Sequence, residues 1–255
     1  MDLNLMTVCI TGAASGIGRA LALGFLNDGA NVVAVDINVE ELKPLEDRGA
    51  ITKIIDVTDF SQVSSMVKTA VDETGRLDVL INNAGVSLVR NIHRFKDDEY
   101  EKVIRVNLFG PVYGIRAAIP IMRSQNFGRI INLVSRGAEA GNNGHSSYSS
   151  SKAALWAVTR CAAVENIDFD ILINGMIPGP SKTNMNPVGQ DPSIVYPSAR
   201  WMALLPTGGP TGKVFWNRKE YMMFREGNIS YNFVKVDWKT GKREILDLKD
   251  RHSDS

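Results

Sequence analysis

The sequence predicts an α/β fold in which a doubly wound parallel sheet is covered by helices on both faces. Short apolar runs recur through the first 216 residues, and helical patterns lie between them. These runs are apolar along their whole length. They lack the alternation of apolar and polar residues that is typical of a strand with one face exposed to solvent. Strands of that kind, alternating with helices, are typical of a parallel sheet buried on both sides.

The strands predicted from these runs are short, and several are followed directly by a polar residue. They are expected at residues 6–11, 31–35, 51–55, 77–81, 129–134, 170–176 and 214–216. Ile17, Leu21 and Phe25 follow the first strand at helical spacing. Asp59 is a candidate N-cap for the helix after the third strand. This order predicts repeated strand–helix–strand units.

Two long helical patterns cover the middle of the chain. They are expected at residues 97–124 and 147–166. Gly110, Pro111 and Pro120 predict bends in the first of them, because proline interrupts helical hydrogen bonding.

The chain changes character after residue 178. Residues 178–211 hold many prolines and several glycines, which predicts loops and one short helix near 198–205. Short strands are then expected at 221–224, 232–238 and 243–246, with a hairpin turn at 239–242 and a frayed tail at 247–255. No linker separates a second domain. We therefore expect one Rossmann-type domain over 1–217 and a short, irregular or β extension over 218–255 packed on it.

Composition limits the kinds of partner. The chain has 255 residues, 44% hydrophobic and 22% charged, with a formal net charge of +1. A nearly neutral chain has no global field for nucleic acid or an anionic membrane, and no apolar run is long enough to span a bilayer. The two cysteines, Cys9 and Cys161, exclude a disulfide framework, and the N-terminus lacks the layout of a signal peptide. We expect a cytoplasmic protein without a metal site that binds neither nucleic acid nor membrane.

A glycine-rich loop joins the first strand to the first helix. Gly12, Gly16 and Gly18 stand in this loop with Ser15 and Ile17. A dinucleotide pyrophosphate needs backbone N–H groups and a helix N-terminus nearby, and a Cβ would block that approach. We expect all five residues to contact such a cofactor.

Asp36 closes the second strand, after the glycine loop and its helix. A carboxylate at this place binds both hydroxyls of the adenosine ribose and repels a 2′-phosphate. The alternative is a turn residue or a helix cap. Neither Ser15 nor Ile37 offers a cation for the phosphate of NADP, so the sequence favours NAD over NADP.

Further motifs follow later strands. They are Asp56-Val57, Asn82-Asn83-Ala84-Gly85, Asn107, Ser135, Tyr148 with Lys152, and Pro178-Gly179 with Thr183. With the glycine loop, they resemble in order and spacing the motifs of the short-chain dehydrogenase/reductase family over about residues 5–185. The resemblance implies that the cofactor is bound by Asp56, Val57, Asn83, Ala84, Gly85, Tyr148, Lys152, Pro178, Gly179 and Thr183.

Tyr148 and Lys152 lie four residues apart in a predicted helix, so they share one face. A cation beside the phenol lowers the pKa of Tyr148, which lets the tyrosine exchange a proton with the oxyanion left by hydride transfer. Ser135 ends the fifth strand, where its hydroxyl can bind the substrate oxygen. The resemblance implies that Lys152 also reaches the nicotinamide ribose and that Asn107 holds a water of the proton relay.

Candidate substrate residues surround this catalytic group. They are Ser135, Arg136, His145, Tyr148 and Met185. Arg136 follows the serine where the family usually has a small or hydroxyl residue, and it binds either an anionic substrate group or a structural salt-bridge partner. His145 is either a donor to the pocket or a rim residue. The sequence leaves the substrate itself open.

The predicted function is an NAD-dependent oxidoreductase that interconverts a secondary alcohol and a ketone. One alternative is an NADPH-dependent carbonyl reductase, because residues 196–213 resemble the ending of carbonyl-reductase-type family members, although Asp36 argues against it. Another is a non-catalytic NAD-binding scaffold or sensor, which would not need Tyr148 and Lys152. Family members pair their long helices, so we expect a homodimer or homotetramer acting on a small molecule.

Overall fold

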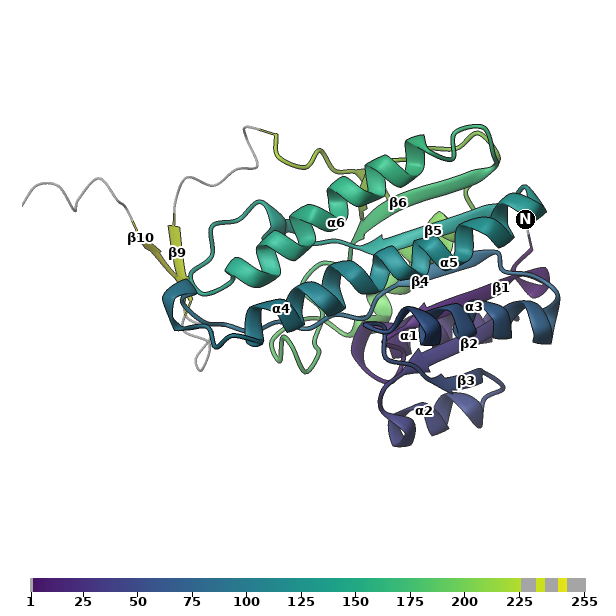
Figure 1. Ribbon diagram of the computed structural model, residues 1–255, viewed down its shortest axis with the longest axis horizontal. Coiled ribbons are helices and arrows are strands. Elements are labelled where there is room, and N and C mark those ends of the chain that lie inside the picture. Colours follow the sequence, from purple (N-terminus) through teal and green to yellow (C-terminus); the bar gives the residue numbers. More distant parts are fainter. Residues whose placement is uncertain (1, 226–232, 237–242, 247–255) are drawn as a thin grey trace, which may run out of the picture.

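The computed structural model describes residues 2–225, 233–236 and 243–246 (Figure 1). Its main sheet has eight strands in the order β3-β2-β1-β4-β5-β6-β7-β8. The strands are β1 (Thr7–Thr11), β2 (Asn31–Asp36), β3 (Ile51–Ile54), β4 (Val79–Asn82), β5 (Gly128–Leu133), β6 (Ile171–Ile177), β7 (Val214–Trp216) and β8 (Lys219–Glu220). All pairs are parallel except β7 with β8. The predicted parallel sheet is confirmed.

The strand order reverses between β1 and β4. Residues 8–10 of β1 pair with residues 79–81 of β4, and the later strands extend the sheet from β4 outward. The loops after β1 and β4 therefore leave in different directions and open a crevice at the carboxyl ends of the strands. The glycine loop and Asn83 lie on these two loops.

Helices cover both faces of the sheet, as predicted. They are α1 (Gly16–Asn27), α2 (Val39–Glu46), α3 (Phe60–Thr74), α4 (Glu99–Ile104), α5 (Gly110–Gln125), α6 (Ser146–Val164) and α7 (Tyr196–Ala203). One apolar cluster packs α1, α2 and α7 against one face, and a second packs α3, α5 and α6 against the other. Figure 1 shows α3, α5 and α6 on the near face.

The predicted helix over 97–124 is a continuous run that contains a π turn. α4 passes through this turn (Arg105–Phe109) into α5. Pro111 has no N–H, so it cannot donate to the carbonyl of Asn107, four residues earlier. The expected bend therefore takes the form of a π turn at Asn107, while Pro120 lies inside α5.

Two local predictions are confirmed near the helix ends. The Asp59 carboxylate caps α3 by accepting from the N–H of Ser61 at 2.8 Å and of Gln62 at 3.4 Å. The short helix expected near 198–205 is α7.

The prediction of a strand over 221–224 is wrong. β7 and β8 form a tight hairpin whose turn residues, Asn217 and Arg218, have φ of 49° and 63°. Pairing stops at Glu220, and Phe224 has a φ of 57°. The Tyr221 N–H still donates to the carbonyl of Val214 in β7 at 2.8 Å. The Tyr221 hydroxyl and the Phe224 N–H donate to the Glu139 carboxylate, so the rest of the segment is held by a side chain.

The hairpin predicted near the C-terminus is confirmed in its strands. β9 (Phe233–Val236) pairs antiparallel with β10 (Arg243–Leu246) in a separate two-stranded sheet. Its predicted turn at 239–242 and the predicted tail at 247–255 lie outside the described residues. Within the described ranges, no helix has the length and apolar character needed to cross a membrane.

Candidate active site

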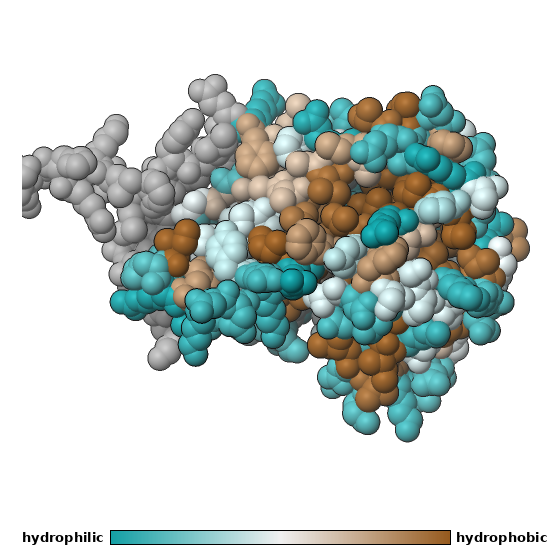
Figure 2. All heavy atoms as spheres, in the orientation of Figure 1, coloured by the Kyte–Doolittle hydropathy of each residue, from teal (hydrophilic) through white to brown (hydrophobic). Residues whose placement is uncertain are grey.

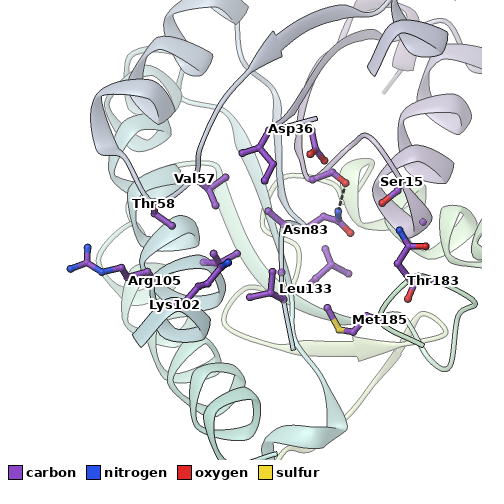
Figure 3. A pocket seen from close by; sticks show the side chains of 18 of the residues that line it. Ser15, Asp36, Val57, Thr58, Asn83, Lys102, Arg105, Leu133, Thr183 and Met185 are labelled. Atoms are coloured by element: carbon purple, nitrogen blue, oxygen red, sulfur yellow. Dashed lines mark hydrogen bonds between the residues drawn. The ribbon is translucent and has the colours of Figure 1, made fainter. Parts of the chain in front are cut away.

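A cleft of about 780 Å³ opens at the carboxyl ends of the parallel strands (Figure 3). The predicted residues that line it are Gly12, Ser15, Gly16, Ile17, Asp36, Asp56, Val57, Asn83, Ala84, Gly85, Tyr148, Lys152, Pro178, Thr183 and Met185. The structure therefore brings most of the predicted site together. Gly18, Asn107, Ser135, Arg136, His145 and Gly179 lie outside this lining.

The glycine loop turns sharply between β1 and α1. Gly12 and Gly16 have φ of +67° and +53°, in the left-handed region that favours glycine. A Cβ on Gly18 would collide with the carbonyl oxygen of Gly12. Ser15 and Ile17 line the cleft beside them, so the N-terminus of α1 faces it and suits an anionic pyrophosphate.

Asn83 fastens the glycine loop to the end of β4 (dashed line, Figure 3). Its side-chain amide donates to the carbonyls of Thr11 at 2.9 Å and Gly12 at 3.0 Å. The Thr11 hydroxyl accepts from the N–H groups of Asn83 and Ala84, both at 3.1 Å. Thr11 is not predicted as a site residue from the sequence. Its position at the end of a strand is the feature of the sequence that could have indicated this role.

Asp36 lies at the end of β2, beside the glycine loop (Figure 3). Its carboxylate accepts from the N–H of Ala14 at 3.0 Å and of Asn38 at 3.1 Å, which fixes the side chain. A neighbouring hollow holds Asp36 together with Arg19, a cation that no sequence motif singles out. Arg19 is in an ion pair with Glu41, so its charge is already balanced.

Another part of the cleft lies between the end of β3 and α4. Asp56 follows β3, and its carboxylate accepts from the N–H and the hydroxyl of Thr58, both at 2.8 Å. Lys102 and Arg105 reach this end from the neighbouring helical run (Figure 3). Sequence reasoning missed them, and their signal was a spacing of three residues on one helix face.

The loop after β6 closes another side of the cleft. A Cβ on Gly16 would lie 2.9 Å from Thr183 Cγ2, so Thr183 packs directly over the glycine loop. Backbone hydrogen bonds of 2.8 and 3.1 Å join Thr183 and Asn186. Met185, 44% exposed, lies beside Thr183 at the mouth of the cleft (Figure 3).

Tyr148 and Lys152 stand on one face of α6. The Lys152 Nζ lies 5.8 Å from the centre of the Tyr148 ring and donates to the carbonyl of Leu133 at 2.7 Å. Burial lowers the pKa of Lys152 to about 8. Burial raises the pKa of Tyr148, and a hydrogen bond with Ser135 partly offsets this. The direction is opposite to the expected one, because desolvation is the largest cause and the Lys152 ammonium is directed to Leu133.

Ser135 lies close to Tyr148, in a tightly packed turn after β5. Its hydroxyl accepts from the N–H of Gly137 at 3.0 Å. A Cβ on Gly137 would lie 3.2 Å from both the Ser135 Oγ and the Tyr148 Cε1. Gly137 was not predicted as a site residue, yet the lack of a side chain there lets the serine and the phenol meet.

Asn107 is fully buried in the π turn. Its side chain accepts from the N–H of Val86 at 2.8 Å and donates to the carbonyl of Val86 at 2.9 Å and to Ser151 Oγ at 3.1 Å. The Cβ position of Gly85 lies 3.4 Å from Asn107 Oδ1 and 3.8 Å from Lys152 Nζ. Asn107 therefore fixes the loop after β4 beside the lysine.

The other candidate substrate residues differ in exposure. Arg136 is exposed, and its guanidinium lies over the rings of Trp216 at 5.2 Å and Tyr221 at 5.9 Å. His145 is 8% exposed and packs edge-on against Tyr148, with ring centres 6.3 Å apart. Burial lowers the pKa of its imidazole. His145 thus belongs to the wall behind the tyrosine and not to an exposed rim.

The residues of the cleft fit a nicotinamide dinucleotide. The glycine positions form a cradle that side chains would fill, and it faces the N-terminus of α1. Asp36 stands where an adenosine ribose would lie, and the volume is in the range of small-molecule sites. Tyr148 and Lys152 would meet the nicotinamide end.

The comparison with known proteins places the chain in a family. Residues 6–192 match the sequence model described as short chain dehydrogenase, and the chain belongs to this family. Its members are oxidoreductases of alcohol or ketone groups that bind a nicotinamide cofactor.

Several relatives cover a similar share of the chain. The chain is 39% identical over 185 residues to 3-oxoacyl-(acyl-carrier-protein) reductase FabG of Thermotoga maritima, covering 70% of this chain and 75% of that protein. It is 36% identical over 186 residues to a diacetyl reductase ((S)-acetoin forming) of Staphylococcus epidermidis, covering 70% and 72%. The crystal structure of a levodione reductase superposes with a TM-score of 0.78 at 26% identity, covering 84% of this chain and 96% of that one.

Proposed function

We propose that the chain is an NAD-dependent oxidoreductase that interconverts a secondary alcohol and a ketone. The observation that carries the proposal is Tyr148 at the cleft, hydrogen-bonded to Ser135, with the Lys152 ammonium 5.8 Å from its ring. A protein that only bound the nucleotide would not need a buried lysine beside this phenol, since burying an ammonium group costs free energy.

The roles follow from the chemistry of each side chain. A bound nicotinamide supplies or accepts the hydride at the substrate carbon. In reduction Tyr148 donates its proton to the carbonyl oxygen, and in oxidation its phenolate takes the hydroxyl proton. Ser135 donates a hydrogen bond to the same oxygen, and Lys152 stabilises the phenolate. The raised pKa of Tyr148 keeps the phenol protonated at neutral pH, which favours its action as an acid.

Asn107 is proposed as the link from this group to solvent. Its side chain is engaged with Val86 and Ser151, which leaves the backbone carbonyl as the group that would hold a water. Pro111 supports this role, because it offers no N–H to that carbonyl.

The preference for NAD rests on two carboxylates. Asp36 is fixed toward the cleft and would bind the ribose hydroxyls while repelling a 2′-phosphate. Glu41 pairs with Arg19, the cation in the hollow next to Asp36. Both features weaken the site for NADP.

The proposal is tested with nicotinamide absorbance. The pure protein is incubated with NAD or NADP and a panel of secondary alcohols, and with NADH or NADPH and the matching ketones. We expect turnover with NAD and NADH on some panel members. NAD binding by calorimetry without turnover on any of them would favour a scaffold or sensor, and absence of binding would contradict the cofactor assignment.

The second candidate is an NADPH-dependent carbonyl reductase. It is favoured by residues 196–213, which resemble the ending of such enzymes. The same assay separates the two, because turnover with NADPH equal to or better than with NADH would reverse the cofactor preference.

We also propose a homodimer or homotetramer that uses α5 and α6. Phe109 is 40% exposed and stacks on Tyr113, and Val164 at the end of α6 is 72% exposed. Figure 2 shows apolar side chains gathered over α5 and toward α6. Such faces are typical of subunit contacts.

The unit proposed to hold cofactor and catalytic groups is residues 1–217, with 218–255 as an extension packed on it. The hydrogen bonds of Tyr221 and Phe224 to Glu139 support that packing for the start of the extension. A cytoplasmic location remains our proposal, and the free thiols of Cys9 and Cys161 are compatible with it.

A further inference from the structure

An exposed cation stands next to the proposed catalytic group. Arg136 lies between Ser135 and Gly137 in the chain, and Gly137 touches both the serine hydroxyl and the Tyr148 ring. The backbone of Arg136 is thus one residue away from the groups that would hold the substrate oxygen. The roles proposed above leave this guanidinium unused.

Trp216 and Tyr221 form an aromatic shelf under Arg136. Their ring centres are 6.0 Å apart, and the guanidinium carbon lies 5.2 and 5.9 Å from them. Trp216 also lies beside the loop after β6, because its Nε1 is 3.5 Å from the Cβ position of Gly179, and the preceding Pro178 lines the cleft. The shelf therefore holds the Arg136 guanidinium over two aromatic rings, next in the chain to Ser135, while Tyr148 lines the cleft.

Arg136 has no ion pair with a carboxylate in the part of the chain that the structure describes. Glu139 is the acidic residue closest to it in sequence, at the end of the same 3₁₀ turn. Both Glu139 oxygens are engaged elsewhere, one by the Tyr221 hydroxyl and one by the Phe224 N–H at 2.7 Å. Tyr221 and Phe224, at the start of the extension, thus bind the Glu139 carboxylate, which would otherwise neutralise the Arg136 guanidinium.

We propose that Arg136 binds an anionic group of the substrate, a carboxylate or a phosphate, while Ser135 and Tyr148 hold its carbonyl or hydroxyl oxygen. This rests on the proposed oxidoreductase function and adds a substrate class, namely keto acids or keto phosphates and their hydroxy counterparts. A guanidinium offers paired N–H donors that match two anion oxygens, and its stacking on the shelf reduces the ordering cost of binding. Trp216 and Tyr221 lie beyond residue 192, where the family match ends.

The first experiment compares ketones that differ only in the anion. One arm uses acetoacetate, 4-oxopentanoate and 5-oxohexanoate, each against its methyl ester, and the other uses dihydroxyacetone phosphate against dihydroxyacetone. We expect kcat/KM with NADH to be at least tenfold higher for the anionic member of one arm, and the arm with the larger ratio identifies the anion. Equal or higher kcat/KM for the neutral members throughout would overturn the proposal.

Matched variants locate the effect. Arg136→Gln is expected to lower kcat/KM for the preferred anionic ketone by about 10- to 100-fold while changing that for its neutral partner less than threefold. Arg160→Gln is the control, because Arg160 is another exposed arginine on an aromatic ring, 5.0 Å from Trp156, and has no contact with Ser135. An equal loss on both ketones, or the same loss in the control, would contradict the assignment.

Tyr221→Phe tests the role of the shelf. It removes the hydroxyl that donates to Glu139 and accepts from Arg136, and it leaves the ring under the guanidinium. The released carboxylate then competes for the guanidinium, so KM for the anionic ketone should rise severalfold with kcat nearly unchanged. An unchanged KM would contradict the proposed sequestering of Glu139.

A binding measurement separates this inference from the proposed function. Calorimetry with the protein saturated with NAD, which cannot reduce a ketone, is run with the same anionic and neutral pairs. Tighter binding of one anion that Arg136→Gln weakens at least tenfold supports the anion site even if the ketone is never reduced. If neutral ketones are turned over but no anion binds more tightly, the proposed oxidoreductase function stands and the proposed anion site is overturned.

Discussion

The Lys152 ammonium donates a hydrogen bond of 2.7 Å to the carbonyl oxygen of Leu133, the last residue of β5. This contact joins the helix that carries Tyr148 to the strand that leads to Ser135. It places a cation inside the protein, and burial lowers the pKa of Lys152 to about 8. Lys152 thus links the helix of Tyr148 to the strand before Ser135, and burying its ammonium group costs free energy.

Lys152→Met is expected to remove a pH-dependent part of the stability. The folded-state pKa of about 8 lies below the ordinary value of 10.5, so between these values the unfolded chain binds more protons than the folded one. Stability relative to the variant must then rise with pH from about 8 to about 10, by about 2–3 kcal/mol. Urea unfolding of both proteins at pH 7, 8, 9 and 10 measures this difference. A difference that stays flat would show that Lys152 is not desolvated.

Asp36→Asn should relax the discrimination against NADP. The substitution removes the charge that repels a 2′-phosphate and keeps an oxygen for the N–H of Ala14 or Asn38. We expect the ratio of kcat/KM for NAD over NADP to fall at least tenfold, about 1.4 kcal/mol. Asp47→Asn, at the exposed end of α2, is the charge-matched control and should keep the ratio. An unchanged ratio in Asp36→Asn would show that Asp36 does not set the preference for NAD over NADP.

Gly137→Ala should impair turnover without impairing cofactor binding. The added methyl group would lie 3.2 Å from the Tyr148 ring and from the Ser135 hydroxyl, so one of them has to move. A displaced phenol is expected to reduce kcat by about 10- to 100-fold. The dissociation constant of NAD, measured by calorimetry, should change less than threefold. A wild-type kcat would mean that the position of the phenol is not critical.

Arg129→Met should destabilise the fold strongly. Arg129 is 1% exposed, pairs with Asp170 at 3.0 Å and donates to the carbonyl of Leu205. The variant leaves a carboxylate and several carbonyls without their partner, at an expected cost of about 3–5 kcal/mol. Urea unfolding measures the loss. The exposed pair of Lys68 and Asp72 is the comparison, because Lys68→Met should change stability by less than about 1 kcal/mol.

The elements of the sheet were predictable because their signal is local. Residues 31–35 and 129–134 read as buried strands from composition alone, and both became parallel strands of the sheet. The segment 221–224 has a similar apolar pattern but forms no strand. Its conformation depends on Glu139, more than 80 residues earlier, and no local pattern reports a contact of that kind.

The candidate site was predictable where a motif carries it. The glycine loop, Asp36 and the pair of Tyr148 and Lys152 all line one cleft. The environment of Arg136 was not predictable, because the shelf is built by residues about 80 positions away that match no motif. The pKa of Tyr148 was misjudged for a related reason: spacing places a cation near the phenol, whereas desolvation depends on the whole fold.

The most direct test of the account is Tyr148→Phe, measured for both turnover and NAD binding. Loss of the phenol hydroxyl should lower kcat by at least 10²-fold, because the proton donor is gone, while the dissociation constant of NAD stays within about threefold of the wild type. Turnover close to that of the wild type would contradict the assignment of Tyr148 as the catalytic acid and base.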